Sequence, residues 1–280
     1  MGNTAFSCAL NNEQIAVALF SGKMSVARMA GENRRGVKSV EVAGQILDHL
    51  ARAQTSVPLR ELAFAGRMSP GKVHRYLASF LRSGLARQEP DTRQYTLGPL
   101  AMRLGLAALN SYQPLRESIA LAHELRNHLD ETMVLSVWGA HGPTIVHVAE
   151  SSQPIIMTMR VGAVLPILQT ASGLAFTAFL PQHFTRRLIK TAFKAKDGAN
   201  LLARDSETVG RLVMQVRKQG YAFNEGHLMP GVSAAAFPLF DRTKSLVAVL
   251  AVMGRHERVN PRDGAGLIAF LKKATEKFGQ

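Results

Sequence analysis

Two apolar patterns at helical spacing, joined by a glycine, lie between residues 58 and 83 and constrain the fold of this chain more than any other stretch. The first pattern begins at Pro58 and is broken by Gly66. The second follows Ser69, which can cap a helix, and Pro70, and it ends at Gly84. Its apolar residues fall on one face: Val73, Tyr76, Leu77 and Phe80. The stretch therefore predicts two helices with a tight turn between them.

The opposite face of the second predicted helix is cationic, polar and small. At about 100° per residue, this outer face carries Gly71, Lys72, Arg75, Ala78, Ser79 and Arg82. Such a face fits a DNA major groove, because Arg and Lys reach guanine edges or phosphates while Gly, Ala and Ser avoid collision. An ordinary surface helix is the alternative, since basic residues are common on solvated faces.

A short hairpin is predicted directly after this helix. Residues 85–87 and 94–97 have the pattern of two strands around the turn Glu-Pro-Asp-Thr. A hairpin in this position is a wing, and Arg87 and Arg93 flank its tip within reach of a phosphate backbone, beside two acidic residues. We therefore expect a winged helix-turn-helix unit. Its candidate DNA contacts are Ser69, Gly71, Lys72, His74, Arg75, Ser79, Arg82, Arg87 and Arg93.

The net charge of the chain agrees with a nucleic-acid partner, and its cysteine content indicates the redox compartment. The 280-residue chain has a formal net charge of +14 and a pI near 10.5, which implies a polyanionic partner. The basic residues extend far beyond residue 83, so charge alone does not locate a site. A single cysteine, Cys8, excludes an intramolecular disulfide framework and fits a reducing compartment. The apolar run at 15–20 is too short for a membrane span, so we expect a cytoplasmic protein without a membrane partner.

Four segments are predicted along the chain. Residues 1–35 show little periodicity and predict a poorly ordered extension. Residues 36–98 form the winged helix-turn-helix domain, in which an amphipathic helix after Ser39 supplies a third wall. Residues 99–113 predict a linker helix whose apolar stripe needs a neighbouring surface. Residues 114–280 alternate helices and strands and predict an α+β domain with helices covering an antiparallel sheet.

The elements expected in this last segment follow from its apolar patterns and turn residues. Helices are expected at 114–130, 170–180, 182–193, 207–218 and from Pro261 onward. Strands are expected at 133–138, 144–149, 155–159, 232–239 and 246–253. The first two strands should form a hairpin, and so should the last two.

Sequence patterns for metal or catalytic chemistry are missing. His123 and His128 frame a string that resembles a zinc-protease motif, but a spacing of five residues rotates them by roughly 140° and points them apart. The other histidines are scattered and have no cysteine partners. The sequence contains no phosphate-binding loop, dinucleotide fingerprint or nucleophile elbow. We therefore expect no metal, no cofactor and no catalytic residues.

The order of the elements and several strings within them resemble the IclR family of bacterial transcriptional regulators, over roughly residues 36–279. The matching strings are Gly-Val-Lys-Ser-Val from Gly36, Val-His-Arg from Val73, Tyr-Thr-Leu-Gly from Tyr95, Arg-Val-Gly from Arg160, Thr-Ala-Ser-Gly from Thr170, Gly-Tyr from Gly220 and Gly-Val from Gly231. The resemblance implies an N-terminal winged helix-turn-helix domain, a linker helix and a C-terminal GAF-like domain. It also implies a homodimer or dimer of dimers that binds double-stranded operator DNA and a small-molecule effector.

Departures from the family pattern concern the effector pocket. Leu168 and Leu174 stand where the family commonly has a His and a polar residue. Small apolar residues and Met253 stand where carboxylate-binding relatives have Cys and hydroxyl side chains. Backbone N–H groups at the helix start near Ser172 are still able to hold a carboxylate. The resemblance therefore implies these candidate effector-binding residues: Met157, Leu165, Thr170, Ala171, Ser172, Gly173, Asn224, Ala234, Ala251 and Met253.

These observations predict a ligand-responsive, sequence-specific DNA-binding transcriptional regulator that senses a small carboxylate with an aromatic or apolar body. Two alternatives remain open. One is an enzyme in the C-terminal domain, with the winged domain as a partner module. The other is an architectural DNA binder without sequence preference, whose binding would be weak and strongly dependent on salt. The predicted pocket could also be filled by its own side chains, because methionines in strands are commonly core residues.

Overall fold

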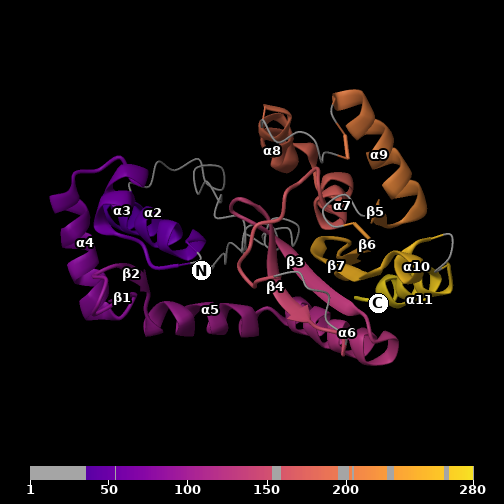
Figure 1. The fold of residues 1–280 in the computed structure, drawn as a ribbon, viewed down its shortest axis with the longest axis horizontal. Helices are drawn as coiled ribbons and strands as arrows, with labels where there is room; N and C mark the ends of the chain where they lie inside the picture. Colours follow the sequence, from indigo (N-terminus) through magenta and orange to yellow (C-terminus); the bar gives the residue numbers. More distant parts are fainter. Residues whose placement is uncertain are drawn as a thin grey trace, which may run out of the picture. The chain divides into compact units, whose positions relative to one another are not determined.

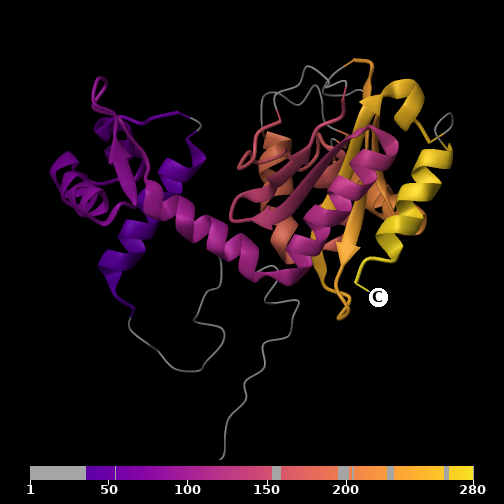
Figure 2. The same ribbon diagram turned by 90° about the horizontal axis from the view of Figure 1, so that it is seen from below.

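The computed structural model describes residues 36–53, 55–152, 159–194, 202–203, 205–225, 230–261 and 265–279, except for the side chains of 109–111 (Figure 1 and Figure 2). The predicted extension at 1–35 lies outside the described residues, as do residues 155–158 of the strand predicted at 155–159, which include Met157; Met159 is described and lies in no strand. The chain divides into two compact units, one that ends at Gln113 and one that continues from Pro114 to the C-terminus.

The unit that ends at Gln113 holds the predicted helix-turn-helix and wing. Its described elements are α2 (Lys38–Arg52), α3 (Leu59–Ala65), α4 (Pro70–Ser83), β1 (Ala86–Gln88), β2 (Tyr95–Leu97) and α5 (Pro99–Ser111). The first three helices and the hairpin enclose one apolar core, which includes Ile46, Leu50, Leu62, Val73, Leu77, Phe80 and Tyr95. The predicted three-helix winged fold is therefore confirmed.

The ends of α4 follow from its sequence with one exception. Pro70 occupies the first turn, where a missing N–H costs nothing, and Gly84 ends the helix with a φ of 77°. Ser69 has the extended backbone of an N-cap, but its side chain makes no capping hydrogen bond. The expected side-chain cap is therefore wrong, and only the backbone of Ser69 starts the helix.

The wing has a long-range attachment that the local patterns did not predict. The N–H of Val57 donates to the carbonyl of Tyr95, and the N–H of Tyr95 donates to the carbonyl of Val57, both at 2.8 Å. This bridge ties the second wing strand to the residues just before α3. The position of the wing beside the two helices is therefore held by backbone hydrogen bonds as well as by the apolar core.

The second unit is an antiparallel sheet of five strands covered by helices. Its described elements are α6 (Gln113–Leu129), β3 (Thr132–Gly139), β4 (Gly142–Ala149), α7 (Ala171–Phe179), α8 (Gln182–Lys194), α9 (Ser206–Gln219), β5 (Ala222–Glu225), β6 (Val232–Phe240), β7 (Leu246–Arg255), α10 (His256–Val259) and α11 (Ala265–Glu276). The strand order is β4-β3-β7-β6-β5, and every neighbouring pair is antiparallel. The predicted α+β class is confirmed, as are the two predicted hairpins.

Two short elements were not predicted. Strand β5 has four residues, Ala-Phe-Asn-Glu, and it lacks the β-branched run that marks a strand in sequence. Helix α10 is a single turn that directly follows β7. The final helix α11 is described from Ala265 rather than from Pro261.

The sheet separates two helical layers (Figure 2). Helix α7 packs on one face against four of the strands, and α11 packs on the other face against β6. Residues 171–178 of α7 are all buried, as expected for a helix that is apolar on every side. Every residue of β3 is buried as well, because both faces of this inner strand are covered.

An ion pair between a buried carboxylate and an exposed arginine lies where the sheet meets α10. Glu131 directly precedes β3 and its side chain is 8% exposed, with Oε1 at 2.5 Å from Nε of Arg258. A side chain at Gly254 would place its Cβ 2.5 Å from the other carboxylate oxygen of Glu131, so glycine at this position makes room for the carboxylate. Burial raises the pKa of Glu131 above its ordinary value of 4.5, and the charge of Arg258 acts in the opposite direction.

Replacement of Glu131 by Gln should change how the stability of the protein depends on pH. Because the pKa of Glu131 is raised in the folded state, the folded protein holds this proton more tightly than the unfolded chain. The contribution of Glu131 to stability is therefore complete below about pH 4.5 and is lost as pH rises through the folded pKa. When melting temperatures are measured from pH 4 to 7, that of wild type should fall relative to that of Glu131→Gln as pH rises. Glu124→Gln, at an exposed position of α6, is the control, and a constant difference between wild type and Glu131→Gln would contradict the assignment.

Candidate DNA-reading helix and effector pocket

The side of α4 that was predicted to face DNA is exposed. All seven candidate contacts on this helix or at its start are exposed: Ser69, Gly71, Lys72, His74, Arg75, Ser79 and Arg82. Between them, Val73 and Leu77 are 0% exposed and Phe80 is 4% exposed. The small, cationic face predicted from helical spacing is therefore separated from the apolar core in three dimensions.

The two candidate contacts in the wing, Arg87 and Arg93, are exposed as well but are held differently. Nη2 of Arg87 lies 2.9 Å from Oε1 of Glu89, so the charge of this arginine is partly balanced by its neighbour. Arg93 adopts a φ of 57°, and its carbonyl accepts a hydrogen bond from the Gln88 side chain at 2.9 Å. The backbone of Arg93 is thus fixed at the tip of the wing while its side chain extends into solvent.

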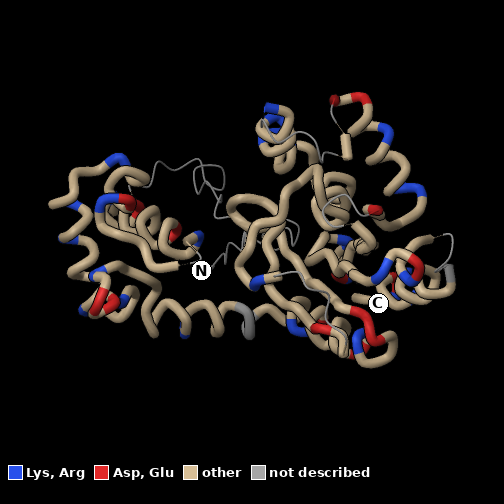
Figure 3. Tube along the Cα trace, viewed as in Figure 1, with Lys and Arg blue, Asp and Glu red and all other residues tan. Residues whose placement is uncertain are grey.

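Two further exposed cations near α4 were not included among the candidates. Arg60 lies on α3, and Arg67 lies in the turn between α3 and α4 with a φ of 48°. The sequence feature that could have marked Arg67 as a candidate is its place, as a cation, inside the predicted turn. Figure 3 shows Lys and Arg along α4 but also along α8 and α9, so cationic residues are not confined to the reading unit.

The first turn of α7 is where the candidate effector contacts gather. The hydroxyl of Thr170 accepts a hydrogen bond from the N–H of Gly173 at 2.9 Å and donates to the carbonyl of Pro166 at 2.8 Å. Of the N–H groups at this helix start, which we expected to be able to hold a carboxylate, that of Gly173 is used by the cap. The N–H groups of Ala171 and Ser172 occupy the first two helical positions and have no carbonyl one turn earlier in the helix.

Gly173 also explains how closely this turn approaches the preceding loop. A Cβ at Gly173 would lie 2.5 Å from the carbonyl oxygen of Ile167, a backbone atom that has no room to move aside. Any side chain at this position would push the start of α7 away from the loop. Glycine therefore lets α7 and the residues before it form one rigid corner.

The sheet supplies the floor below this corner. Asn224 pairs with Ala234, and Ala234 pairs with Met253, so these three side chains form one row on one face of the sheet. Ala251 pairs with Ala236, two residues further along, and therefore lies on the same face. This face packs against α7. The structure thus brings Asn224, Ala234, Ala251 and Met253 to one surface beneath the helix.

Asn224 connects the floor to the corner directly. Its Nδ2 donates to the carbonyl of Gln169 at 2.7 Å, immediately before the Thr170 cap. The side chain is buried, at 6% exposure. Asn224 is thus fixed beside the first turn of α7, and its role at the polar end of an effector pocket stays a prediction.

Leu165 packs against the same hydrophobic core as Ala234, Ala251 and Met253, but its backbone is held at the other edge of the sheet. Its N–H donates to the carbonyl of Pro143 at 2.7 Å, on β4, which is at the opposite edge of the sheet from β5 and Asn224. It also lines a surface hollow of about 340 Å³ together with His141 and Leu188. The remaining candidate, Met157, lies outside the described residues.

A serine, histidine and carboxylate do meet elsewhere in this unit. Nδ1 of His256 lies 2.8 Å from Oγ of Ser233, and Nε2 lies 3.3 Å from Oε1 of Glu225 and 2.9 Å from Nδ2 of Asn260. The spacing of these residues in sequence gave no motif, because they come from β5, β6 and α10. Ser233 is only 1% exposed, so its hydroxyl cannot approach a substrate, and the cluster joins elements rather than forming an active site.

The two histidines that resembled a metal motif point to different neighbours. The ring of His123 lies 4.7 Å from that of His147, whereas the ring of His128 lies 5.0 Å from that of Phe270. Within the described residues, no group of three or more His, Cys, Asp or Glu side chains is placed to hold a metal ion. None of the described helices is both long enough and apolar enough to cross a bilayer.

The described residues thus form a winged helix-turn-helix followed by a helix-covered antiparallel sheet. Family models match both parts of the chain: the IclR helix-turn-helix domain matches residues 39–90, and the bacterial transcriptional regulator IclR C-terminal domain matches residues 107–279. The chain therefore belongs to the IclR family of bacterial transcriptional regulators.

Individual relatives agree with this membership. The glycerol operon regulatory protein of Streptomyces griseus is 27% identical over 82% of this chain and 89% of its own length. The transcriptional repressor IclR of Escherichia coli K12 is 25% identical over 87% of this chain and 90% of its own. Among solved structures, HmgR of Pseudomonas aeruginosa is 37% identical, with a TM-score of 0.66 over 87% of this chain and 100% of that one.

A more distant structure shares the fold. An IclR homologue from Microbacterium hydrocarbonoxydans, solved in complex with 4-hydroxybenzoate, is 17% identical, with a TM-score of 0.64 over 85% of this chain and 98% of that one. The relatives are transcriptional regulators, and none of these findings supports the enzyme alternative.

Arg75 and Arg93 should affect DNA binding in different ways. Arg75 lies on the exposed face of α4, so Arg75→Ala should remove about 1–3 kcal/mol of discrimination at one base position. Arg93→Ala, at the wing tip, should weaken binding by a similar factor on all sequences. The measurement is a gel-shift competition, with DNA selected by the wild-type protein from a random library and single-base variants of it. Arg211→Ala on α9 is the control, and an unchanged sequence preference in Arg75→Ala would show that α4 is oriented differently.

Proposed function

We propose that this regulator binds a near-palindromic operator through residues 36–98, connects its domains through residues 99–113, and binds an aromatic or apolar carboxylate through residues 114–280. Its place of action is the cytoplasm, where a bacterial operator is found. The observation that carries the proposal is that the chain contains both an exposed cationic α4 in one unit and, in the other unit, a mostly apolar floor beneath the capped start of α7.

In the DNA-reading unit, the proposed roles follow from position on α4 and the wing. Arg75 and Lys72 read base edges, because they extend from the exposed face between positions occupied by small residues. Gly71 and Ser79 allow the helix to approach the groove. Ser69 and His74 lie near the N-terminal end of α4, where this helix would enter the groove. Arg82, Arg87 and Arg93 contact phosphates on either side. Ser79 donates to the carbonyl of Arg75 at 3.3 Å, which holds its hydroxyl against the helix and keeps the surface small.

In the second unit, called the effector unit from here on, the side chains that line the proposed pocket favour a ligand with one anionic group on an apolar body. Ala234, Ala251 and Met253 offer no hydrogen bonds from their side chains. A compact acid with several polar groups would lose water there without replacement, at a cost of about 1–3 kcal/mol for each unpaired group. An aromatic ring can lie on this floor, while its carboxylate accepts from the first-turn N–H groups of Ala171 and Ser172.

The remaining candidates complete this pocket in the proposal. Asn224 borders the polar end, and Thr170 with Gly173 holds the helix start in position rather than binding the ligand directly. Met157 and Leu165 would bound the apolar end. The 4-hydroxybenzoate complex described above is a property of that homologue, and it motivates an aromatic panel for this chain.

The linker helix supports a homodimer or a dimer of dimers. Met102, Leu104 and Leu106 of α5 are 63%, 56% and 53% exposed, so large apolar side chains meet water on more than one side of this helix. One winged domain also makes a small interface with DNA, so two copies on two half-sites raise affinity and specificity together.

Aromatic acids should bind and small polar acids should not. Benzoate, 4-hydroxybenzoate, phenylacetate and the apolar aliphatic acid hexanoate are compared with acetate and glyoxylate by calorimetry and by thermal shift. At one hundred times Kd, a ligand stabilises the protein by about 2.7 kcal/mol, which raises the melting temperature by several degrees. Ala234→Met, which fills the floor, should abolish the response. Tight binding of a two-carbon acid without any aromatic response would reverse the proposal, and no response at all would mean that the pocket is filled by its own side chains.

Light scattering at micromolar concentration should give a dimer or a tetramer. Leu104→Glu places a charge at an exposed apolar position of α5 and should shift the protein toward monomer and weaken binding to a two-half-site operator. Met214→Glu on α9, at a position that is 66% exposed, is the matched control and should leave the assembly unchanged. A wild-type monomer, with and without DNA, would rule out this arrangement.

A further inference from the structure

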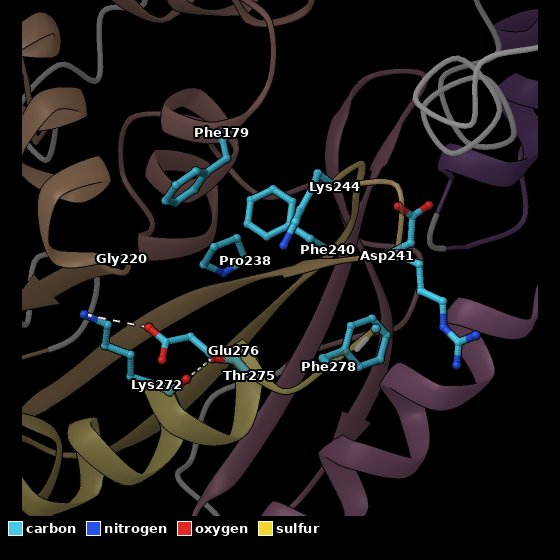
Figure 4. Close-up of a pocket in the computed structure, with 12 residues that line it drawn as sticks. Phe179, Gly220, Pro238, Phe240, Asp241, Lys244, Lys272, Thr275, Glu276 and Phe278 are labelled. Carbon is cyan, nitrogen blue, oxygen red and sulfur yellow. Dashed lines mark hydrogen bonds and ion pairs between the residues drawn. The ribbon is translucent and has the colours of Figure 1, made fainter.

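A second hollow, of about 520 Å³, lies beside the far end of β6 (Figure 4). It exists because the edge strand β5 is short. Strand β5 pairs only with residues 233–236, whereas β6 continues to Phe240, so its last four residues have no described strand on that side. The end of α7 and the end of α11 border the space that remains.

The hollow is distant from the proposed effector pocket. Ala234, in that pocket, and Phe240, in this hollow, are six residues apart on one strand, which corresponds to roughly 20 Å at about 3.3 Å per residue. The first turn of α7 borders the effector pocket and its last residue, Phe179, borders the hollow. A ligand in one site therefore does not touch the side chains that form the other.

Aromatic and apolar side chains form the walls. The rings of Phe179 and Phe240 lie edge to face, with centroids 5.7 Å apart and an interplanar angle of 84°. Pro238 and Phe278 line the hollow as well, and all four side chains are only half-buried. In Figure 4 the rings of Phe179, Phe240 and Pro238 lie together, and Phe278 lies apart from them. A flat apolar body would remove these surfaces from water.

Lys244 supplies a cation at this wall. It lies in the turn between β6 and β7, and in Figure 4 its ammonium group points back toward Phe240 and Pro238. Its φ is 66°, in the left-handed region where glycine or asparagine would fit at less cost than lysine. Residues held in such conformations are concentrated at ligand sites, because the surrounding structure must hold them there.

The acidic neighbours of Lys244 are already engaged. Oδ1 of Asp241 accepts hydrogen bonds from the N–H of Thr243 at 2.9 Å, from its hydroxyl at 2.6 Å and from the N–H of Ser245 at 3.0 Å, which builds the turn. Glu276 lies 4.0 Å from Nζ of Lys272. With Arg242 the lining contains three cations and two carboxylates, so a single negative charge on a ligand would be favoured over two.

A small molecule fits this place better than an added peptide strand. A strand that joined the open edge of β6 would need a ladder of N–H donors, and Pro238 has none in this segment. The C-terminal residues also cross the edge, since a Cβ at Gly279 would collide with the carbonyl of Phe240. We propose that the hollow is a second ligand site, for a monoanion with an aromatic body that Lys244 anchors.

Fluorescence titration of the full chain with 1-anilinonaphthalene-8-sulfonate, an aromatic monoanion that brightens in apolar surroundings, tests the site. Lys244→Asn removes the cation but suits the left-handed turn, so the variant should fold, as its melting curve will verify. Its affinity for the probe should fall about tenfold, the usual effect of losing one charge-assisted hydrogen bond. Lys190→Asn on α8 is the matched control and should bind like wild type.

Further variants separate this site from the effector pocket. Phe278→Ala should also lower probe affinity, while Ala234→Met, which alters only the effector pocket, should not. Loss of probe binding in Ala234→Met with full binding in Lys244→Asn would place the probe in the effector pocket and overturn the proposal. Absence of probe binding to wild type, or equal binding by all variants, would overturn it too. A change in the light-scattering mass of Lys244→Asn would identify the hollow as an interface between copies instead.

Discussion

The close packing of α7 on the sheet is the constraint on which the effector unit depends. Gly173 lets the first turn of α7 touch the backbone of Ile167. Four small residues on the facing strands let the helix pack close to the sheet: Ala222, Ala234, Ala236 and Ala251. Residues 171–178 are buried, so the helix has no freedom to tilt without exposing apolar surface or breaking contacts. The proposed effector pocket borders the first turn of α7, and the second proposed ligand site borders its last residue, Phe179.

This packing also explains why the proposed effector pocket has a mainly apolar lining. Alanines that admit a helix cannot offer hydrogen bonds, so the polar contribution must come from backbone N–H groups and from Asn224 at the edge. The Thr170 cap uses one of those N–H groups and holds the others in place. In our proposal, the pocket therefore discriminates by the shape of an apolar body and by one negative charge.

In the DNA-reading unit the corresponding constraint is the core beneath α4. Val73, Leu77 and Phe80 lock the rotation of the helix about its axis, and this rotation decides which side chains meet DNA. The net charge of +14 does not decide it, because cations also cover α8 and α9 (Figure 3). Charge attracts the polyanion over a distance, and the buried face of α4 determines which residues then read it.

Local patterns in the sequence determined the helix-turn-helix, the wing and most of the sheet, because apolar spacing, Pro70 and Gly84 act within a few residues. Only the tertiary structure decided what depends on distant partners. Strand β5 forms because β6 offers it an edge, Val57 joins the wing through Tyr95, and Ser233 meets His256 across two elements. The hollow at Lys244 likewise results from β5 ending before β6 does. Such features arise from the register between strands, and the physical reason that sequence does not reveal them is that each residue contributes only half of every pairing.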